Sequence, residues 1–210
     1  MPDWSEENNF NGIIAGIDEA GRGPWVGPVV AGAVVFFTRN INPVLLKSLN
    51  DSKKLSSKKR EELFELIIKE SNLGNLSYGI GEASAQEIDK INILQATFNA
   101  MRRAVDNLSV APDIALIDGN QIPRPFKCKV KTVIKGDAIS MSIAAASIVA
   151  KVYRDNLLKD LAIKYPQYGF EKNAGYGTKV HIDALQKYGI TPEHRKSYKP
   201  IAEIIKSQQK

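Results

Sequence analysis

The sequence predicts an α/β fold in which short buried strands alternate with helices. Apolar runs rich in β-branched residues, typical of buried strands, occur at 13–17, 29–37 and 114–117. Hydrophobic residues recur every three or four positions over 88–108, which is the spacing of one face of a helix. The first and third apolar runs end on carboxylates, which indicates that the strand ends carry function.

The composition is that of one globular domain spanning residues 1–210. Of the 210 residues, 43% are hydrophobic and 25% charged, and no flexible linker divides the chain. No apolar stretch approaches the roughly 18 residues of a membrane span, and the polar, acidic N-terminus lacks the features of a secretory signal. The single cysteine, Cys128, cannot support a disulfide framework, so we expect a cytoplasmic protein. The net charge of +6 favours a polyanionic partner.

Two adjacent carboxylates, Asp18 and Glu19, end the first apolar run. Gly21 and Gly23 follow, and glycine permits backbone angles closed to other residues and lets a ligand approach the main chain closely. Two prolines then stiffen the connection to the second apolar run. An acidic strand end beside a loop that carries Arg22 indicates a site for a metal ion and a phosphate.

A basic run at 51–60 leads into a helix that we expect to begin at Ser56 or Ser57. Its five Lys and Arg residues fit either a surface that contacts phosphate or a solvated helix face. Lys53 is the best candidate for a phosphate contact. A strand weakened by glycine is expected next, at 76–81.

The helix over 84–108 is the most clearly defined element. Ser84 and Glu87 form the pattern of a capping box at its start. Its apolar residues fall on one face, so they form a buried stripe and need no cofactor to explain them. They are Ile88, Ile91, Leu94, Phe98, Met101, Val105 and Leu108.

Two further strands are each followed by an acidic residue. The run at 114–117 ends on Asp118, and an alternating strand at 129–134 is followed by Gly136 and Asp137. A helix is expected from Ala138 onward, and its many small residues would let it lie close against a sheet. Further on, Tyr176 lies between two glycines and a short helix follows.

Thr191 and Pro192 predict the start of another helix, because proline is tolerated in the first helical turn. His181 is expected on a helix face and His194 in a C-terminal basic cluster, so we do not interpret them as a catalytic pair. Cys128 is interpreted as a small packed residue rather than a nucleophile.

Three strand ends can bring four carboxylates to one edge of a sheet: Asp18, Glu19, Asp118 and Asp137. Clustered carboxylates repel one another unless a cation lies among them, and hard oxygen ligands favour Mg²⁺ or Mn²⁺ over zinc. Two such ions roughly 4 Å apart would activate a water and stabilise the leaving oxygen of a phosphodiester. Because successive strand residues face opposite ways, Asp18 and Glu19 reach one ion only through a bulge or turn, which Gly16 or Gly21 would supply.

Several of these residues also fit a purely structural role. Asp137 equally fits a helix N-cap, and Asp118 precedes a turn sequence. Asp155 lies four residues after Lys151, so we interpret it as an exposed helix ion pair rather than a ligand. Tyr176 equally fits a half-buried core position.

Several motifs together resemble the signature of type 2 ribonucleases H, the ribonuclease HII family. They are DEAGRGPWVGPVVAGAV at 18–34, DSKKLS at 51–56, EIDKINILQATFNAMRRAV at 87–105, KGDAISMSIAAASIVAKVYRD at 135–155, GYGT at 175–178 and HRKSY at 194–198. The resemblance implies a ribonuclease-H-like mixed sheet of about five strands flanked by helices, with a C-terminal helical extension. Type 3 ribonucleases H share the acidic set but usually carry a substantial N-terminal extension, whereas seventeen residues precede Asp18 here.

The resemblance also implies roles for particular residues. The catalytic and metal-binding carboxylates would be Asp18, Glu19, Asp118 and Asp137. The residues that sense the ribonucleotide would be Gly21, Arg22, Gly23 and Tyr176. Phosphate contacts would come from Lys53, Ser147 and Lys151.

The implied function is that of an endonuclease dependent on Mg²⁺ or Mn²⁺. It would hydrolyse the RNA strand of RNA/DNA hybrids and cut 5′ of ribonucleotides embedded in duplex DNA, leaving 3′-hydroxyl and 5′-phosphate ends. Its role would be ribonucleotide excision repair and clearance of RNA during DNA replication. We expect a monomer, and no motif in the chain identifies a sliding-clamp partner.

Two other classes of function remain open from the residues. One is a non-catalytic nucleic-acid-binding module whose carboxylates are caps and turns. The other is a ribonuclease-H-like nuclease acting on DNA alone, such as a junction resolvase, in which Tyr176 would have no obvious use. Metal-dependent cleavage of a duplex with an embedded ribonucleotide distinguishes them.

Overall fold

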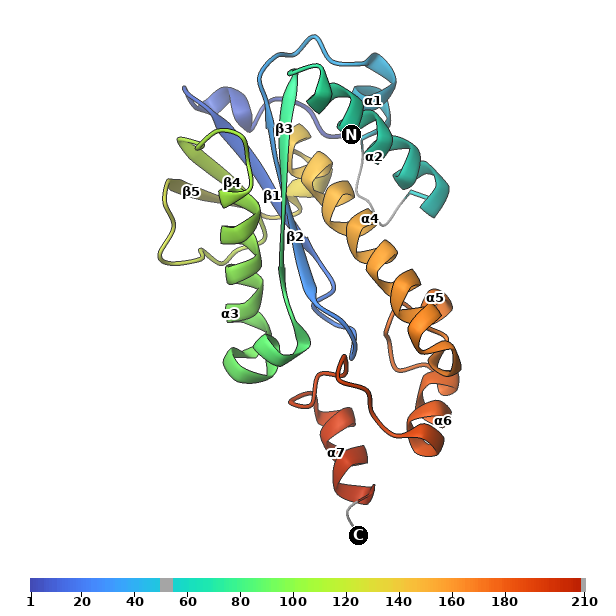
Figure 1. Cartoon of the computed structure of the whole chain (residues 1–210). Coiled ribbons are helices and arrows are strands. Elements are labelled where there is room, and N and C mark those ends of the chain that lie inside the picture. The colour runs from blue at the N-terminus through green and yellow to red at the C-terminus, as the bar shows by residue number, and fades with distance from the viewer. Residues whose placement is uncertain (50–54, 209–210) are drawn as a thin grey trace.

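A five-stranded mixed sheet forms the centre of the computed structural model, which describes residues 1–49 and 55–208 (Figure 1). In spatial order the strands are β3 (Leu76–Ala83), β2 (Val29–Phe36), β1 (Ile14–Ala20), β4 (Ile114–Asp118) and β5 (Lys129–Val133). The β2 strand is antiparallel to both of its neighbours, β3 and β1, whereas β1, β4 and β5 run parallel to one another. The α/β class and the mixed sheet expected from the sequence are confirmed.

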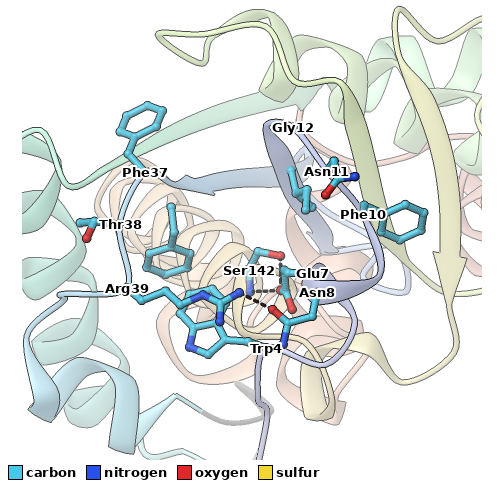
Figure 2. Close-up of a pocket in the computed structure, with 12 residues that line it drawn as sticks. Trp4, Glu7, Asn8, Phe10, Asn11, Gly12, Phe37, Thr38, Arg39 and Ser142 are labelled. Atoms are coloured by element: carbon cyan, nitrogen blue, oxygen red, sulfur yellow. Dashed lines mark hydrogen bonds between the residues drawn. The ribbon is translucent and has the colours of Figure 1, made fainter.

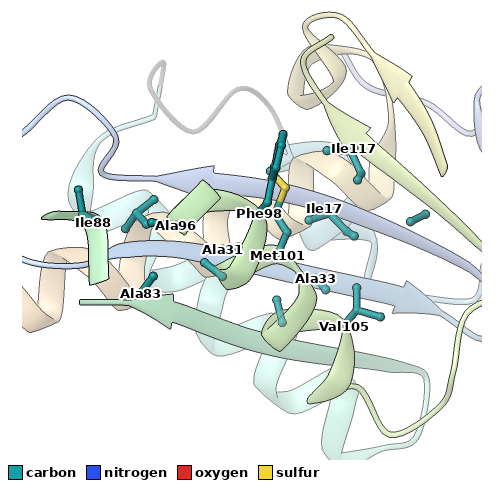
Figure 3. Packing of buried hydrophobic residues seen from close by; sticks show 14 residues of the cluster. Ile17, Ala31, Ala33, Ala83, Ile88, Ala96, Phe98, Met101, Val105 and Ile117 are labelled. Carbon is teal, nitrogen blue, oxygen red and sulfur yellow. The ribbon is translucent and has the colours of Figure 1, made fainter. Parts of the chain in front are cut away.

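Helices cover both faces of the sheet. The helix α3 (Ala85–Asp106) packs on one face, where Phe98, Met101 and Val105 meet Ile17 from β1 (Figure 3). Cys128 packs against this cluster, as expected for a small apolar residue. The other face carries α4 (Met141–Lys164), with α1 (Pro43–Ser48) and α2 (Ser57–Asn72) beside it. None of the helices in the described part of the chain is both long and apolar enough to cross a membrane.

Helix starts follow the predicted caps, but α3 is not continuous. The Ser56 hydroxyl caps α2, and the Ser84 hydroxyl caps α3 by accepting the N–H of Glu87 at 3.1 Å. Within α3, Asn92 has a φ of 70°, and its Oδ1 accepts the N–H of Leu94 at 3.0 Å. Asn92 therefore acts as a second N-cap, and the single uninterrupted helix expected here is wrong.

The helix α4 begins three residues later than expected and lies in contact with the sheet. Its N-cap is Ser140, while Ala138 belongs to the short 3₁₀ helix η3 (Gly136–Ala138). A Cβ added to Gly16 would lie 2.1 Å from the main chain of Ser142, and one added to Gly32 would lie 2.4 Å from another α4 carbonyl. Both glycines are needed because the helix backbone approaches the strands so closely.

The N-terminal segment covers the end of the sheet where β1 begins. The short helix η1 (Glu7–Asn9) places Glu7 against the start of α4, where its Oε1 accepts hydrogen bonds from the Ser140 and Ser142 hydroxyls, each at 2.6 Å. Trp4 packs edge to face on Phe36, with ring centroids 5.1 Å apart. Figure 2 shows the cavity of about 450 Å³ beside these residues. It lies at the opposite end of β1 from Asp18.

The C-terminal part is helical and has its own small core. It contains η4 (Pro166–Tyr168), α5 (Phe170–Asn173), α6 (Lys179–Tyr188) and α7 (Lys199–Gln208), which pack around Tyr168, Phe170, Leu185 and Ile201. The expected C-terminal helical extension is thus confirmed. The helix predicted to start at Thr191 is wrong, because Thr191 forms a turn in which its N–H donates to His194 Nδ1 at 2.9 Å.

Candidate active site

The ends of three parallel strands bring aspartates to one edge of the sheet. The β1 and β4 strands pair in register, so Asp18 and Asp118 come at the carboxyl ends of neighbouring strands. The next strand, β5, leads into η3, which carries Asp137. The Oδ1 of Asp118 accepts the N–H of Gly136 at 2.7 Å, which ties η3 to the end of β4. The strand ends converge even though these residues are far apart in the sequence.

Asp18 and Glu19 point to opposite faces of the sheet, because both belong to the regular ladder between β1 and β2. Asp18 forms a side-chain hydrogen bond with Ser147 of α4. On the other face, Glu19 Oε1 lies 3.3 Å from a guanidinium nitrogen of Arg22. Glu19 therefore approaches the acidic edge from the side away from α4.

The bulge expected at Gly16 or Gly21 does not occur in these described residues. The β1 strand stays in register with β2 from Ala15 to Ala20. Gly16 makes room for α4, and Gly21 lies beyond the strand, where it has a φ of +92°. No bulge in the strand therefore brings the Glu19 and Asp18 side chains to the same face.

Burial raises the pKa of Asp18 well above its ordinary value, and the charges of Glu19 and Asp118 raise it further. Hydrogen bonds from Ser147 and from the Glu19 N–H, which donates to Asp18 Oδ1 at 2.7 Å, act in the opposite direction. A divalent cation would relieve this repulsion, and the donors are all hard oxygens, so they fit Mg²⁺ or Mn²⁺. In residues 1–49 and 55–208, no three acidic, His or Cys side chains are already gathered closely enough to form a metal cage. A bound cation would therefore have to draw the carboxylates closer together.

The alternative role of Asp137 as an N-cap is wrong. The cap of α4 is Ser140, and η3 begins after Lys135 without a side-chain cap. Asp137 is nonetheless only 8% exposed, beside the Asp118 strand end. Asp118, in contrast, does hold a turn through its bond to Gly136, so its structural role coexists with any metal role.

A cavity of about 370 Å³ opens beside the acidic edge. Its walls are the loop after β1, one face of α4 and the Tyr176 loop. The lining residues are Asp18, Glu19, Ala20, Gly21, Arg22, Gly23, Ser147, Lys151, Arg154 and Tyr176. Most residues singled out from the sequence therefore meet in one place. Asp118 and Asp137 lie at the same sheet edge without lining the cavity, and Lys53 falls outside the described residues.

Sequence reasoning missed Arg154, which is 2% exposed and lines the cavity. Burial and the charge of Arg195 lower its pKa to about 10. It lies against the loop after β1, because a Cβ added to Gly21 would come within 1.9 Å of its Nε. Arg154 lies seven residues after Ser147 and three after Lys151, which places all three on one helix face. This spacing is the sequence signal that could have identified Arg154.

Lys151 and Ser147 both have partners within the protein. Lys151 lies 2.5 Å from Asp155, whose other oxygen lies 3.5 Å from Arg60 of α2. The expected ion pair is confirmed, but the Asp155 side chain is 20% exposed and thus partly buried rather than exposed. Ser147 is buried against Asp18 and helps to orient that carboxylate. Phosphate contacts by Lys151 and Ser147 stay predictions.

Tyr176 is not a core residue, since it is 52% exposed and lines the cavity. It faces the loop after β1, because a Cβ added to Gly23 would lie 3.4 Å from its ring. Gly177 could carry no side chain, because the ring of Trp25 lies 1.9 Å from the position of a Cβ. The Trp25 N–H donates to the carbonyl of Gly175 at 2.8 Å, which joins the two loops.

His181 and His194 form a buried pair behind the Tyr176 loop. Their Nε2 atoms are 3.0 Å apart, and His181 Nδ1 donates to the Tyr176 carbonyl at 2.9 Å because a carbonyl can only accept. His194 Nδ1 accepts the Thr191 N–H, so one neutral tautomer of each ring satisfies every bond. Burial lowers the pKa of both, that of His194 to about 4. Neither lines the cavity, so they brace the loop and are not a catalytic pair.

The sheet order, the aspartates at its edge and the cavity beside them together define a ribonuclease-H-like nuclease. The family model described as ribonuclease HII matches residues 15–201. The chain is 54% identical over 205 residues to a ribonuclease HII of Paramagnetospirillum magneticum, covering 98% of this chain and 99% of the relative. It is 52% identical over 205 residues to a ribonuclease HII of Wolbachia from Brugia malayi, covering 98% and 97%. The chain belongs to the ribonuclease HII family and is therefore a type 2 ribonuclease H, an endoribonuclease that acts on RNA/DNA hybrids.

Solved structures show the same fold. The ribonuclease H2 of Pyrococcus horikoshii matches with a TM-score of 0.76 at 28% identity, over 94% of this chain and 99% of that one. A ribonuclease HII of Archaeoglobus fulgidus, solved in complex with PCNA, matches with a TM-score of 0.69 at 28% identity, over 91% and 96%. Bst-RNase HIII in complex with Mn²⁺ shares the fold alone, with a TM-score of 0.70 at 16% identity, over 93% of this chain and 70% of that one.

Proposed function

We propose that residues 1–210 form one catalytic domain that cuts the RNA strand of RNA/DNA hybrids and also cuts 5′ of single ribonucleotides in duplex DNA. The observation that carries this proposal is the shared cavity, in which the acidic strand end meets the Gly21, Arg22 and Gly23 loop and Tyr176. The acidic strand end suits hydrolysis of a phosphodiester, and the loop with Tyr176 suits contact with a sugar. Family membership supports the first activity directly.

Four carboxylates would hold the metal: Asp18, Glu19, Asp118 and Asp137. When bound, Mg²⁺ or Mn²⁺ supplies an activated water and stabilises the leaving oxygen, giving 3′-hydroxyl and 5′-phosphate ends. The raised pKa of Asp18 is consistent with this assignment, because it arises from burial and, beyond that, from the charges of Glu19 and Asp118. The Mn²⁺ complex of Bst-RNase HIII supports the choice of metal.

The loop and Tyr176 would recognise the ribonucleotide. The main chain of Gly21, Arg22 and Gly23 would contact the 2′-hydroxyl, the one group that distinguishes RNA from DNA at a given sugar. Tyr176 would stack on the neighbouring deoxyribose. Phosphates would be bound at the cavity by Lys151 and Arg154, with Ser147 beside them. Lys53, outside the described residues, stays a predicted phosphate contact.

An exposed tyrosine against the glycine loop favours this function over a nuclease for DNA alone, which has no 2′-hydroxyl to sense. In the cell, the enzyme would serve ribonucleotide excision repair and RNA clearance during replication. The PCNA complex of the Archaeoglobus relative supports a search for a clamp partner. A monomeric state and a cytoplasmic location stay predictions.

The test compares three duplexes of one sequence: an RNA/DNA hybrid, a DNA duplex with one ribonucleotide, and plain DNA. With Mg²⁺ or Mn²⁺, we expect cleavage of the first two, with the second cut 5′ of the ribonucleotide. Ca²⁺ should permit binding with little cleavage, because its coordination is larger and looser. Robust cleavage in excess chelator, or cleavage of plain DNA, would contradict the proposal.

A further inference from the structure

A buried arginine, Arg195, holds the loop after β1 from the side away from the cavity. It is 0% exposed, and its guanidinium donates to the carbonyls of Gly21 at 2.6 Å, Arg22 at 2.8 Å and Gly27 at 3.0 Å. The Tyr198 hydroxyl accepts from Arg195 at 2.9 Å and donates to the Arg22 carbonyl at 2.5 Å. The Arg195 guanidinium thus donates to main-chain oxygens and a hydroxyl, and not to a carboxylate.

A buried cation is costly unless hydrogen bonds compensate it, and one placed on main-chain oxygens fixes those oxygens in space. The segment that carries Arg195 is itself anchored, because Val26 and His194 form a β-bridge and the Arg195 N–H donates to the Trp25 carbonyl at 2.8 Å. The carbonyls of Gly21 and Arg22 are therefore held by a fixed point of the fold, 174 and 173 residues away in sequence.

The direction of these carbonyls determines the direction of two N–H groups. In a planar trans peptide, the C=O of one residue and the N–H of the next point in opposite directions, and the peptides after Gly21 and Arg22 are trans. Holding the two carbonyls toward Arg195 therefore turns the N–H groups of Arg22 and Gly23 away from it. In the part of the chain that the structure describes, neither N–H donates to a protein acceptor. Both residues line the cavity.

We propose that Arg195, assisted by Tyr198, is a positioning residue that aims the Arg22 and Gly23 N–H groups at the 2′-hydroxyl and adjacent phosphate of the substrate. This inference rests on the proposed function, in which the loop contacts that sugar. Arg195 does not reach the cavity itself. Its effect is on how well the loop distinguishes a ribonucleotide from a deoxyribonucleotide, since donors fixed on a hydroxyl reject the analogue that lacks it.

The test measures selectivity, because a general loss of folded protein would not change it. Affinity in Ca²⁺ is measured for a duplex with one ribonucleotide and for the all-DNA duplex. The selectivity ratio, which is the dissociation constant of the all-DNA duplex divided by that of the duplex with one ribonucleotide, is compared among variants. Arg195→Lys keeps the charge but replaces a fork of donors by a single ammonium, which cannot reach three carbonyls. We expect the ratio to fall roughly tenfold, the worth of about one hydrogen bond to a hydroxyl. Tyr198→Phe, which removes only one oxygen, should lower it about threefold.

The control is Ile67→Ala, which cuts a fully buried side chain of α2 and should lower thermal stability while leaving the ratio unchanged. An unchanged ratio in both Arg195→Lys and Tyr198→Phe overturns the inference while leaving the proposed function intact. A wild-type ratio near one overturns the recognition role of the loop, and the inference with it. If Arg195→Lys does not fold, Tyr198→Phe decides.

Discussion

The acidic strand ends and the two loops beside them, the loop after β1 and the Tyr176 loop, are held in place by different means. Asp18 lies near the carboxyl end of β1 and Asp118 ends the neighbouring parallel strand β4, so regular ladder hydrogen bonds place them. The loop after β1 is held by the Arg195 guanidinium and the Tyr176 loop by the buried pair of His181 and His194. We infer from the comparison that the groups proposed for cutting and for recognition have separate supports, so each should be open to disruption without the other.

The largest expected effect is the loss of cutting when an edge carboxylate is neutralised. Asp18→Asn and Asp118→Asn each remove a charged metal ligand but keep its shape, so we expect activity on hybrid and single-ribonucleotide substrates to fall alike, by roughly 10³-fold or more. Initial rates with Mg²⁺ on both substrates measure this. Near-normal turnover by either variant would sink the metal assignment.

The same Asp18 variant should not be less stable than the wild type at neutral pH. The pKa of Asp18 is raised in the folded protein, so the stabilisation from its carboxyl group is fully present below its unfolded pKa and is lost as the pH rises through the folded pKa. Asparagine carries no charge to be repelled. A thermal melt that shows marked destabilisation would assign the activity loss to misfolding.

A smaller effect, confined to recognition, is expected for Tyr176→Ala. We expect roughly tenfold less cleavage of the single-ribonucleotide duplex and little change on the uniform hybrid, because one stacked contact is worth about 1–3 kcal/mol. The matched control is Tyr188→Ala, since both tyrosines are 52% exposed but Tyr188 does not line the cavity. Equal losses on both substrates would remove Tyr176 from recognition of the RNA to DNA junction.

The smallest expected effect on cleavage comes from the histidine pair, which instead makes the stability of the fold depend on pH. The pKa of His194 falls from an ordinary 6.5 to about 4 on folding, so its contribution is fully present above pH 6.5 and is lost as the pH falls towards 4. The difference amounts to at most about 3 kcal/mol. Protonation of His194 Nδ1 would also remove the hydrogen bond from the Thr191 N–H, because Nδ1 must accept there.

Urea unfolding at pH 7 and pH 5 measures this effect. The control is His194→Gln, which cannot titrate and should lose less stability between the two pH values than the wild type. Equal losses in the two proteins would exclude the histidine pair as the source.

Local patterns predicted much of the site because strand ends and caps are set by neighbouring residues. The apolar run ending on Asp118 and the hydroxyl caps at Ser56 and Ser84 all occur as expected. The errors fall where distant parts compete with a local signal. Thr191 resembles a helix start, yet its N–H and hydroxyl bond to the ring of His194, whose own partner is in α6.

The sequence alone therefore determined the alternation of strands and helices, the acidic strand ends and the glycines that need an open backbone, because these depend on residue type and short spacing. The tertiary structure decided that Asp18 faces α4 while Glu19 faces away, that Arg154 lines the cavity, and that Arg195 holds a loop more than 170 positions away. No short spacing encodes these contacts. They arise when the sheet closes, α4 packs on Gly16, and the C-terminal segment pairs with residue 26, so that main-chain oxygens far apart in sequence meet one guanidinium.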